Sequence, residues 1–340
     1  MSRYYSIICF ILLGVSLVFP GTLKKKDAPP RKVIIGTVCL PLWEKYPGLE
    51  KRCANLGALV DSLAARSQGK YKRGLDLAIL SEFALTDMSL PVTKSALALD
   101  SPGFKYFKDK AKKHKTYLVV PAVIREGNKI LNAAVLLGRD GRTIGQYAKT
   151  HPVPDKPPAE TFEGGTTPGN TYPVFNLDFG NVGIQICFDY RFEEGWRELA
   201  RQGAELIVHT TMSPSVSIDG ARAVNNHVYV VTSTWRDNAS VIEPTGMVAA
   251  QIQQPQKLLV HEIDLEYRLL PWPSTGEKLK KQYQDQIGFH YYPSEDLGIF
   301  WSNDAAVPID SMVRWQGVWT DDEYVADARK RYREYKKKTK

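Results

Sequence analysis

A cysteine lies where an apolar strand-like run gives way to a helix-like one. Cys187 closes the β-branched run 182–187, and the segment 193–202 behind it is rich in helix-forming residues and ends before Gly203. A thiol at a strand end, close to the positive end of a helix, is favoured as the thiolate, which is its reactive form. The pattern predicts a nucleophile at Cys187, and the alternative is a buried structural thiol.

Two other strand ends carry the groups that a thiol nucleophile needs. Glu82 follows the apolar run 75–80, where burial suits a carboxylate to general-base work. Lys149 follows the hairpin 131–148, and its ammonium could stabilise a thiolate and an oxyanion. Taken singly, they are equally typical of a loop glutamate and a solvated lysine. Because ligand sites in open α/β sheets gather at the carboxyl ends of strands, we expect the three side chains to converge.

The segments around these residues together resemble the nitrilase superfamily, the carbon–nitrogen hydrolases with a Glu-Lys-Cys triad. The resemblance runs from about Lys32 to about Leu265, and the matching stretches are ILSEF, GRTIGQYAKTHPVP, VGIQICFDYRFEEGWRELARQGAELI and ARAVNNHVYVVTS. It implies an α/β fold, namely a four-layer α-β-β-α sandwich. It also implies a homodimer or higher homo-oligomer.

The resemblance assigns a role to each reactive residue. Cys187 would be the nucleophile and Glu82 the general acid/base. Lys149 would stabilise the tetrahedral intermediate, with the backbone N–H of Phe188 as the second oxyanion donor. No cofactor is implied, and the six histidines lack a metal-ligand spacing such as H-x-x-x-H.

Further site residues are expected on either side of this set. Many members of the superfamily carry an additional glutamate after the lysine; Glu160 and Glu163 are the candidates, and the spacing to the following Pro-Gly pair favours Glu163. His151 is expected to line the substrate pocket. Asp189 and Arg191 either shape that pocket or pair with each other as a structural cap.

The residues after the nucleophile favour one reaction. Cys-Phe-Asp is closer to the Cys-Tyr-Asp or Cys-Trp-Asp of amide-directed members than to the Cys-Trp-Glu of nitrilases. We expect hydrolysis of a non-peptide C–N bond in a small amide or N-carbamoyl compound, through a thioester, with release of ammonia or an amine. The alternatives are a nitrilase, an acyltransferase, and a non-catalytic binding protein on the same fold.

The chain divides into four predicted parts. Residues 1–22 resemble a signal peptide or an N-terminal anchor, because Arg3 precedes a mostly apolar run of signal-peptide length. Residues 23–32 read as a linker, 33–265 as the hydrolase domain, and 266–340 as a C-terminal extension with a basic helical tail. The protein is therefore expected to be exported: periplasmic, extracellular, or anchored facing outward. Residues 266–318 show little periodicity and are expected to wrap the sandwich or a partner subunit.

Charge and cysteines add two expectations. The net charge of +8 is concentrated at the chain ends, so nucleic-acid binding by the domain is not supported. The basic tail beyond Ala328 could contact an anionic membrane or the cell envelope, or be a solvated helix end. Cys39 and Cys53 could form a disulfide in an oxidising compartment; we favour two buried thiols.

Overall fold

The structure is a computed structural model that describes residues 30–271, 273–292 and 295–339. The predicted signal peptide or anchor, and the linker up to residue 29, lie outside the described residues. Among the helices described, none has both the length and the apolar composition needed to cross a membrane.

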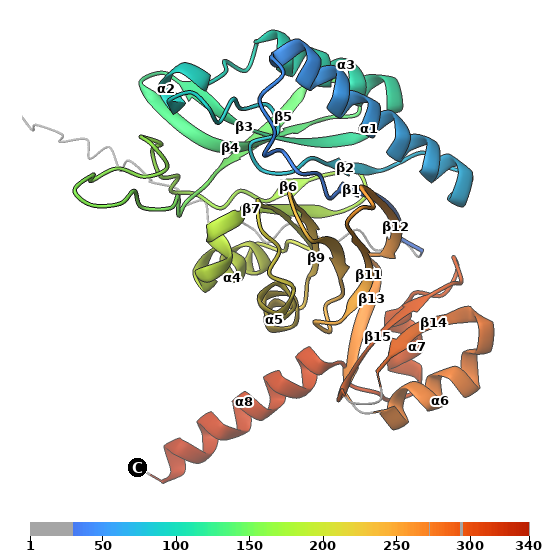
Figure 1. The fold of residues 1–340 in the computed structure, drawn as a ribbon. Helices are drawn as coiled ribbons and strands as arrows, with labels where there is room; N and C mark the ends of the chain where they lie inside the picture. Colours follow the sequence, from blue (N-terminus) through green and yellow to red (C-terminus); the bar gives the residue numbers. More distant parts are fainter. Residues whose placement is uncertain (1–29, 272, 293–294, 340) are drawn as a thin grey trace, which may run out of the picture.

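Two six-stranded sheets form the body of the molecule (Figure 1). The first has the order β12 (Leu258–Asp264), β1 (Lys32–Val38), β2 (Leu77–Ile79), β3 (Tyr117–Glu126), β4 (Lys129–Leu137) and β5 (Thr143–Ala148). The second has the order β11 (Val248–Gln253), β10 (Asn238–Ile242), β9 (Tyr229–Ser233), β8 (Leu206–Thr210), β7 (Asn181–Ile186) and β6 (Phe175–Asn176).

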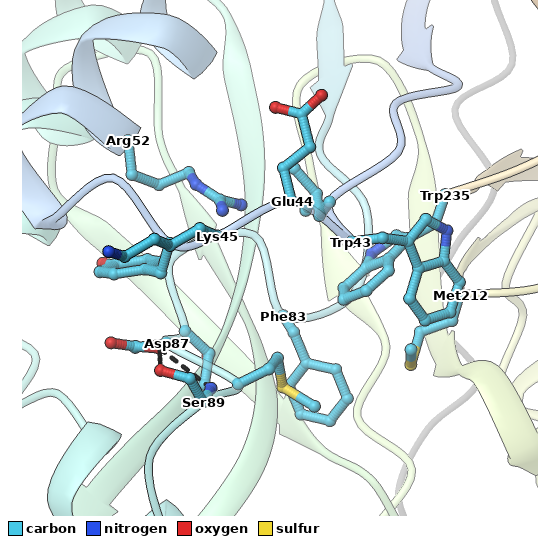
Figure 2. Close-up of a pocket in the computed structure, with 13 residues that line it drawn as sticks. Trp43, Glu44, Lys45, Arg52, Phe83, Asp87, Ser89, Met212 and Trp235 are labelled. Carbon is cyan, nitrogen blue, oxygen red and sulfur yellow. Dashed lines mark hydrogen bonds between the residues drawn. The ribbon is translucent and has the colours of Figure 1, made fainter.

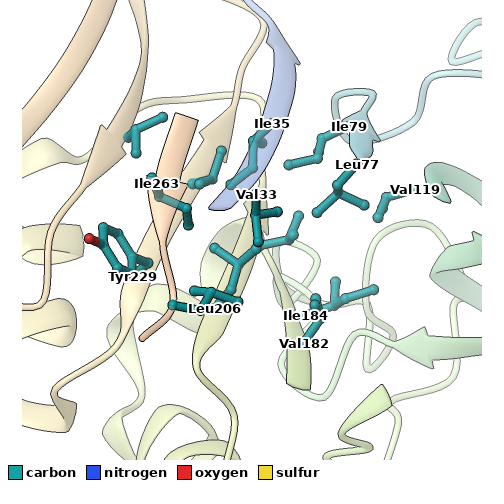
Figure 3. Close-up of a cluster of buried hydrophobic side chains, with 14 of the residues drawn as sticks. Val33, Ile35, Leu77, Ile79, Val119, Val182, Ile184, Leu206, Tyr229 and Ile263 are labelled. Atoms are coloured by element: carbon teal, nitrogen blue, oxygen red, sulfur yellow. The ribbon is translucent and has the colours of Figure 1, made fainter. Parts of the chain in front are cut away.

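Helices cover the outer face of each sheet (Figure 1). Helices α1 (Leu49–Tyr71) and α3 (Pro102–His114) lie on the first sheet, and α4 (Glu193–Arg201) and α5 (Val216–Asn226) lie on the second. A four-residue helix, α2 (Val92–Ser95), lies in the connection before α3. The inner faces of the sheets meet in a continuous apolar core (Figure 3). The predicted four-layer α-β-β-α sandwich is confirmed.

Alternation along the strands explains why the sheets are covered on both faces. In β1, Val33 and Ile35 face the core between the sheets, whereas Ile34 packs in the second cluster, under α1 and α3. Successive side chains of a strand point to opposite faces, so a continuous run of apolar residues contributes side chains to the cores on both faces of the sheet. Burying one such side chain stabilises the fold by about 1.5–3 kcal/mol relative to leaving it exposed.

The same alternation separates the two cysteines that could have formed a disulfide. Cys39 belongs to the core between the sheets, whereas Cys53, on α1, belongs to the cluster on the opposite face of the first sheet. Both are free, buried thiols, as we favoured.

Strand directions bring the predicted site residues to one edge. Strand β2 runs parallel to β1 and β3, and β5 runs the same way because two antiparallel pairings separate it from β3. In the other sheet β7, β8 and β9 are parallel. A parallel bridge between Cys39 and Thr234 joins the carboxyl ends of β1 and β9. The carboxyl ends of the key strands from both sheets therefore meet.

The C-terminal part forms more regular structure than its weak periodicity indicated. Strands β13 (Tyr267–Pro271), β15 (Leu297–Ser302) and β14 (Ile287–Tyr291) make a small antiparallel sheet. It packs with α6 (Pro273–Tyr283) and α7 (Ile309–Trp315) around a core of its own. Its strands are short and aromatic, so the sequence shows little alternation over them. Helix α8 (Asp321–Lys338) begins at a capping box and projects from the body (Figure 1).

Candidate active site

Glu82 is fully buried at the carboxyl end of β2. Its Oε1 accepts hydrogen bonds from Lys149 Nζ and from Asn132 Nδ2, each at 2.9 Å, and its Oε2 accepts one from the backbone N–H of Met212 at 3.1 Å. The indole N–H of Trp235 donates to the Glu82 carbonyl oxygen at 2.7 Å. Donors from three separate segments thus hold this carboxylate in one orientation, and Trp235 fixes the backbone beside it.

Lys149 is the only lysine among the fully buried side chains of the described chain, and it lies between two carboxylates. Its Nζ is 2.9 Å from Glu82 Oε1 and 2.5 Å from Glu163 Oε1. Burial by itself lowers the pKa of the ammonium, but the charges of Glu82, Cys187 and Glu163 outweigh it and raise the pKa above the usual lysine value. Lys149 is therefore a permanent cation, suited to hold an oxyanion but not to act as a base.

Asn132 is a site residue that the sequence reasoning missed. It lies on β4, is 2% exposed, and its Nδ2 donates to Glu82 Oε1 and to Glu163 Oε2, both at 2.9 Å. A signal was present, because it is the one polar residue in the apolar strand segment 130–137. Buried polar side chains need partners, so such a residue indicates a polar cluster at that point.

Glu163, not Glu160, is the second glutamate at the lysine. Its backbone N–H donates to the Val153 carbonyl at 2.9 Å, and its Oε1 accepts from the Val153 N–H at 3.1 Å. Asp155 ties down the same loop by accepting from the Gly164 N–H at 2.9 Å. Glu160 is exposed on the outside of the loop. The loop therefore delivers one carboxylate to Lys149 through its backbone geometry.

Cys187 lies at a sharp turn directly after β7. Its φ is 44°, in the left-handed region that non-glycine residues seldom adopt, and such strain is typical of functional turns. Residues Cys187–Arg191 form a 3₁₀ turn, and α4 begins only at Glu193. The strand end and the helix expected over 193–202 are present, and a separate turn lies between Cys187 and that helix.

The surroundings of Cys187 oppose the thiolate that its position at a strand end was expected to favour. Burial, followed by the negative charge of Glu82, raises the pKa of the Cys187 thiol to about 12, although Lys149 and hydrogen bonds from Thr211 and Met212 act in the opposite direction. The thiol is thus protonated at neutral pH. A neighbouring base must take its proton during the reaction, and Glu82 is the adjacent carboxylate.

A buried pair lies behind the nucleophile's turn. His209 Nε2 donates to the Cys187 carbonyl oxygen at 3.1 Å, and its Nδ1 is 2.8 Å from Asp219 Oδ1. Both side chains are fully buried. The hydrogen bond from His209 gives a donor to the Cys187 carbonyl, which the strained turn would otherwise leave buried without a partner.

Asp189 supports the turn from its other side. It is fully buried, and its carboxylate accepts from the Ile186 N–H at 3.0 Å, from Tyr147 Oη at 2.8 Å and from the His151 N–H at 2.9 Å. These contacts tie the end of β7 to the end of β5. Its oxygens are occupied by protein donors, so the expected pocket role does not fit this position.

The remaining predicted residues are placed as follows. Arg191 makes no ion pair with Asp189 in the described structure; its guanidinium lies 5.2 Å from the ring centroid of Tyr190 and is exposed. His151 stacks on Phe192 at 3.9 Å, with its Nδ1 3.0 Å from Asp189 Oδ1. Phe188 is the second residue of the 3₁₀ turn, where backbone N–H groups lack partners inside the turn, so its N–H suits an oxyanion donor.

A cavity of about 290 Å³ is lined in part by residues that adjoin Glu82 or donate hydrogen bonds to it (Figure 2). Three lining residues are neighbours of Glu82: Phe83 follows it in the chain, Met212 donates its backbone N–H to the Glu82 carboxylate, and Trp235 donates its indole N–H to the Glu82 carbonyl. The rest of the lining comes from residues 42–46, from residues 86–89 and from Arg52. Within the described ranges, no group of three or more His, Cys, Asp or Glu side chains is arranged to hold a metal ion.

The sequence matches the family model "Carbon-nitrogen hydrolase" over residues 46–268. This range covers more than half of the chain and includes Glu82, Lys149 and Cys187. The chain belongs to the carbon–nitrogen hydrolase family. The resemblance drawn from the motifs is confirmed.

Curated members of the carbon–nitrogen hydrolase family are about 30% identical to the chain over the regions that match. It is 30% identical over 177 residues to "Omega-amidase NIT2" of Homo sapiens, a match that covers 46% of this chain and 64% of that protein. It is 28% identical over 254 residues to "Deaminated glutathione amidase" of Synechocystis sp. (strain PCC 6803 / GT-S), covering 64% and 88%. The matched region therefore spans less than two thirds of the human relative.

Solved structures of the family share the fold. Nit3 of Saccharomyces cerevisiae, described as a member of branch 10 of the nitrilase superfamily, superposes with a TM-score of 0.59 at 19% identity, covering 76% of this chain and 97% of that one. The carbon–nitrogen hydrolase of Helicobacter pylori G27 superposes with a TM-score of 0.58 at 18% identity, covering 74% and 93%. Because the sequence identities are below 25%, these superpositions show that the chain shares the fold of the two structures and no more.

Proposed function

We propose that the protein hydrolyses the C–N bond of a small amide or N-carbamoyl compound, with Cys187 as nucleophile. The observation that carries the proposal is the buried cluster of Lys149 between Glu82 and Glu163, placed where its charges act directly on the Cys187 thiol. Removing three charged groups from water costs free energy, so such a cluster is typical of a functional site. Acyl transfer needs a base and an oxyanion-binding cation beside the nucleophile, and this cluster contains both.

The reaction starts with proton transfer from Cys187 to Glu82. The thiolate attacks the amide carbonyl, and Lys149 with the Phe188 N–H holds the oxygen that becomes negative. Glu82 then donates its proton to the leaving nitrogen, the C–N bond breaks, and ammonia or an amine departs. Water, deprotonated by Glu82, attacks the thioester, which releases the carboxylic acid and restores the Cys187 thiol.

Two other functions are compatible with the fold. A nitrilase would use the same nucleophile on a C≡N bond, but Asp189 stands where such enzymes usually have glutamate. A non-catalytic binding protein would have no need to keep the strained turn at Cys187 or the buried charges beside it. Both observations favour the amidase.

The test is intact-protein mass spectrometry with a panel of small amides, carbamoyl compounds and nitriles, run on the wild type and on Cys187→Ala. We expect product release, or a transient acyl adduct, that is lost in Cys187→Ala. Glu160→Gln serves as a control, because that glutamate is exposed and lies away from the cluster.

The outcome separates the three functions. Adducts from nitriles alone would replace the amidase with the nitrilase. If the wild type, like Cys187→Ala, releases no product and forms no adduct with any compound of the panel, the result would favour the non-catalytic binding protein.

The proposal extends to assembly and location. We expect a homodimer or higher homo-oligomer, which light scattering coupled to gel filtration would measure. We also expect export, supported by the apolar run after Arg3; N-terminal sequencing of protein recovered from the cell envelope or medium tests it. Exposed Tyr332 and Tyr335 among the basic residues of α8 support contact with an anionic membrane, which vesicle sedimentation measures.

A further inference from the structure

We infer that two copies of the chain assemble through α8, by antiparallel pairing of a seam made of Val325, Ala328, Tyr332 and Tyr335. The inference rests on the homo-oligomer proposed above and names the element that joins its subunits. It does not depend on catalysis, and α8 lies beyond the range 46–268 that matches the family model.

Helix α8 is long, regular and uncovered. It projects from the body of the molecule (Figure 1), and none of its 18 residues, all of which the structure describes, is buried. Every residue from Arg329 to Thr339 is exposed, and Tyr332 and Tyr335 are 68% and 69% exposed. Most helices in proteins are stabilised by the packing of one face rather than by the backbone alone. In the described structure the distal half of α8 has no such packing, so a partner can supply it.

The four residues of the seam have the spacing of a coiled coil. They follow one another along α8 at steps of three, four and three residues, which places them on one face of the helix. In heptad terms Val325 and Tyr332 occupy the a positions, and Ala328 and Tyr335 occupy the d positions. Such a narrow stripe, confined to a and d, is typical of a helix that pairs with one other helix.

The sizes of these side chains favour an antiparallel pair. With Lys330 at the level of the two-fold axis, Tyr332 lies opposite Ala328 of the second copy, and Tyr335 lies opposite Val325. Each large ring then meets a small side chain, so the layers of the pair fill similar volumes. Parallel pairing would put tyrosine against tyrosine in two layers and alanine against alanine in another.

The charges of α8 favour the same direction and the same register. Its first turn is acidic (321–323) and its last turn is basic (336–338). The register set by the seam places each acidic turn against the basic turn of the other copy, whereas parallel pairing would place like charges together. Arg329 and Arg331 flank the centre, where like charges meet, and their long side chains can extend into water.

An anionic membrane is the other candidate to cover the seam, and it fits less well. A helix that lies in a membrane surface has a broad apolar face and a basic polar face. The seam of α8 is narrow, and its first turn carries three carboxylates. Basic residues such as Lys330 and Arg333 lie on the outer face of the pair, where they remain available to lipid.

Disulfide cross-linking tests the direction of the pairing. Val325→Cys and Tyr335→Cys, each on a Cys187→Ala background, are expressed separately and together and exposed to oxidised glutathione. We expect covalent dimers only from the co-expressed chains. In an antiparallel pair the unlike positions lie opposite each other, whereas like positions are about 15 Å apart along the helix axis, too far for a disulfide. Arg333→Cys co-expressed with Val325→Cys is the control, because Arg333 points away from the seam.

Sedimentation velocity of the full chain measures how much the seam contributes to dimer affinity. Tyr332→Ser/Tyr335→Ser should weaken the dimer roughly 10-fold or more, because buried tyrosines are among the residues that contribute most at interfaces. Lys330→Ser/Arg333→Ser, on the outer face of the same turns, should keep the wild-type affinity. Thermal melting shows whether both variants fold.

Each outcome decides the inference. Cross-links from either variant alone, or none from the co-expressed chains, overturn it. If light scattering still finds a dimer in that case, the homo-oligomer stands and uses other surfaces. Vesicles of phosphatidylserine and phosphatidylcholine test the membrane: a monomer whose binding to them depends on Tyr332 and Tyr335 would show that lipid covers the seam, which also overturns the inference.

Discussion

At the scale of single residues, the members of the catalytic cluster differ in charge and therefore in the role that each can take. Lys149 is held between Glu82 and Glu163 and stays a cation, while the Cys187 thiol stays protonated until a base removes its proton. Asn132 holds both carboxylates through one amide group. Glu82 thus has two opposite effects on Cys187: its charge disfavours the thiolate, and its oxygen provides the place for the proton.

These two effects give a prediction for Glu82→Gln. Turnover should fall about 10²–10⁴-fold, because the base is gone. The pKa of Cys187 should fall as well, because a negative charge that raises it has been removed. Steady-state kinetics and a pH titration of the thiolate's ultraviolet absorbance, referenced to Cys187→Ala, measure both. Glu160→Gln should alter neither, and a thiol pKa that rises in Glu82→Gln would contradict the account.

Asn132→Leu tests the residue that the sequence reasoning missed. Two carboxylates would each lose a hydrogen bond, and a bond to a charged group contributes about 1.5–3 kcal/mol, so kcat should fall at least 10-fold. Gln146→Leu on the neighbouring strand β5, where the amide contacts Glu126, is the matched control and should keep wild-type kcat. Equal kcat in the two variants would show that Asn132 does not position the cluster.

At the scale of elements, the nucleophile's turn is held from both sides. Asp189 ties the end of β7 to the segment after β5, and His209 from β8 donates to the Cys187 carbonyl. His209 in turn lies against Asp219 of α5. The strained φ of Cys187 persists because the surrounding elements over-determine it.

The pair behind the turn can be tested by single and double substitution. His209→Leu leaves the Asp219 carboxylate buried without its partner, which should destabilise the protein by roughly 3–5 kcal/mol. His209→Leu/Asp219→Leu should regain most of that stability in urea unfolding. Its kcat should stay low, because the Cys187 carbonyl still lacks a donor. If the double variant recovers kcat together with stability, the pair is only structural.

At the scale of the whole molecule, α8 is attached to the sandwich through a few polar contacts. His227, at the end of α5, has its Nδ1 2.9 Å from Asp322 Oδ1 and its Nε2 3.5 Å from Asp321 Oδ2. The hydrogen bond to Asp322 raises the pKa of His227, although burial acts against it. The docking of α8 is therefore linked to protonation.

The sign of that linkage predicts weaker docking at alkaline pH. A histidine whose folded pKa lies above its unfolded value of about 6.5 stabilises fully below that value, and the contribution is lost as the pH rises through the folded pKa. Amide hydrogen exchange in α8, corrected for the intrinsic pH dependence, should show less protection on the alkaline side. His227→Gln should abolish this difference; the same pH dependence in that variant would refute the linkage.

The sequence by itself determined the element types and the order of the reactive residues. Alternation and turn signals place the hairpin before Lys149 and the short strand before Glu82, and the capping box at Thr320 places α8, because these signals are local along the chain. The convergence of Glu82 and Lys149 followed from strand direction.

Only the tertiary structure decided the rest, because it depends on what surrounds each group. The thiol's high pKa comes from burial and from a carboxylate more than 100 residues away in the chain. Asp189 supports the turn because Tyr147 and His151 donate hydrogen bonds to its carboxylate. Local sequence patterns indicate the element on which a residue lies. Tertiary packing determines which atoms its side chain contacts and how far it is removed from water.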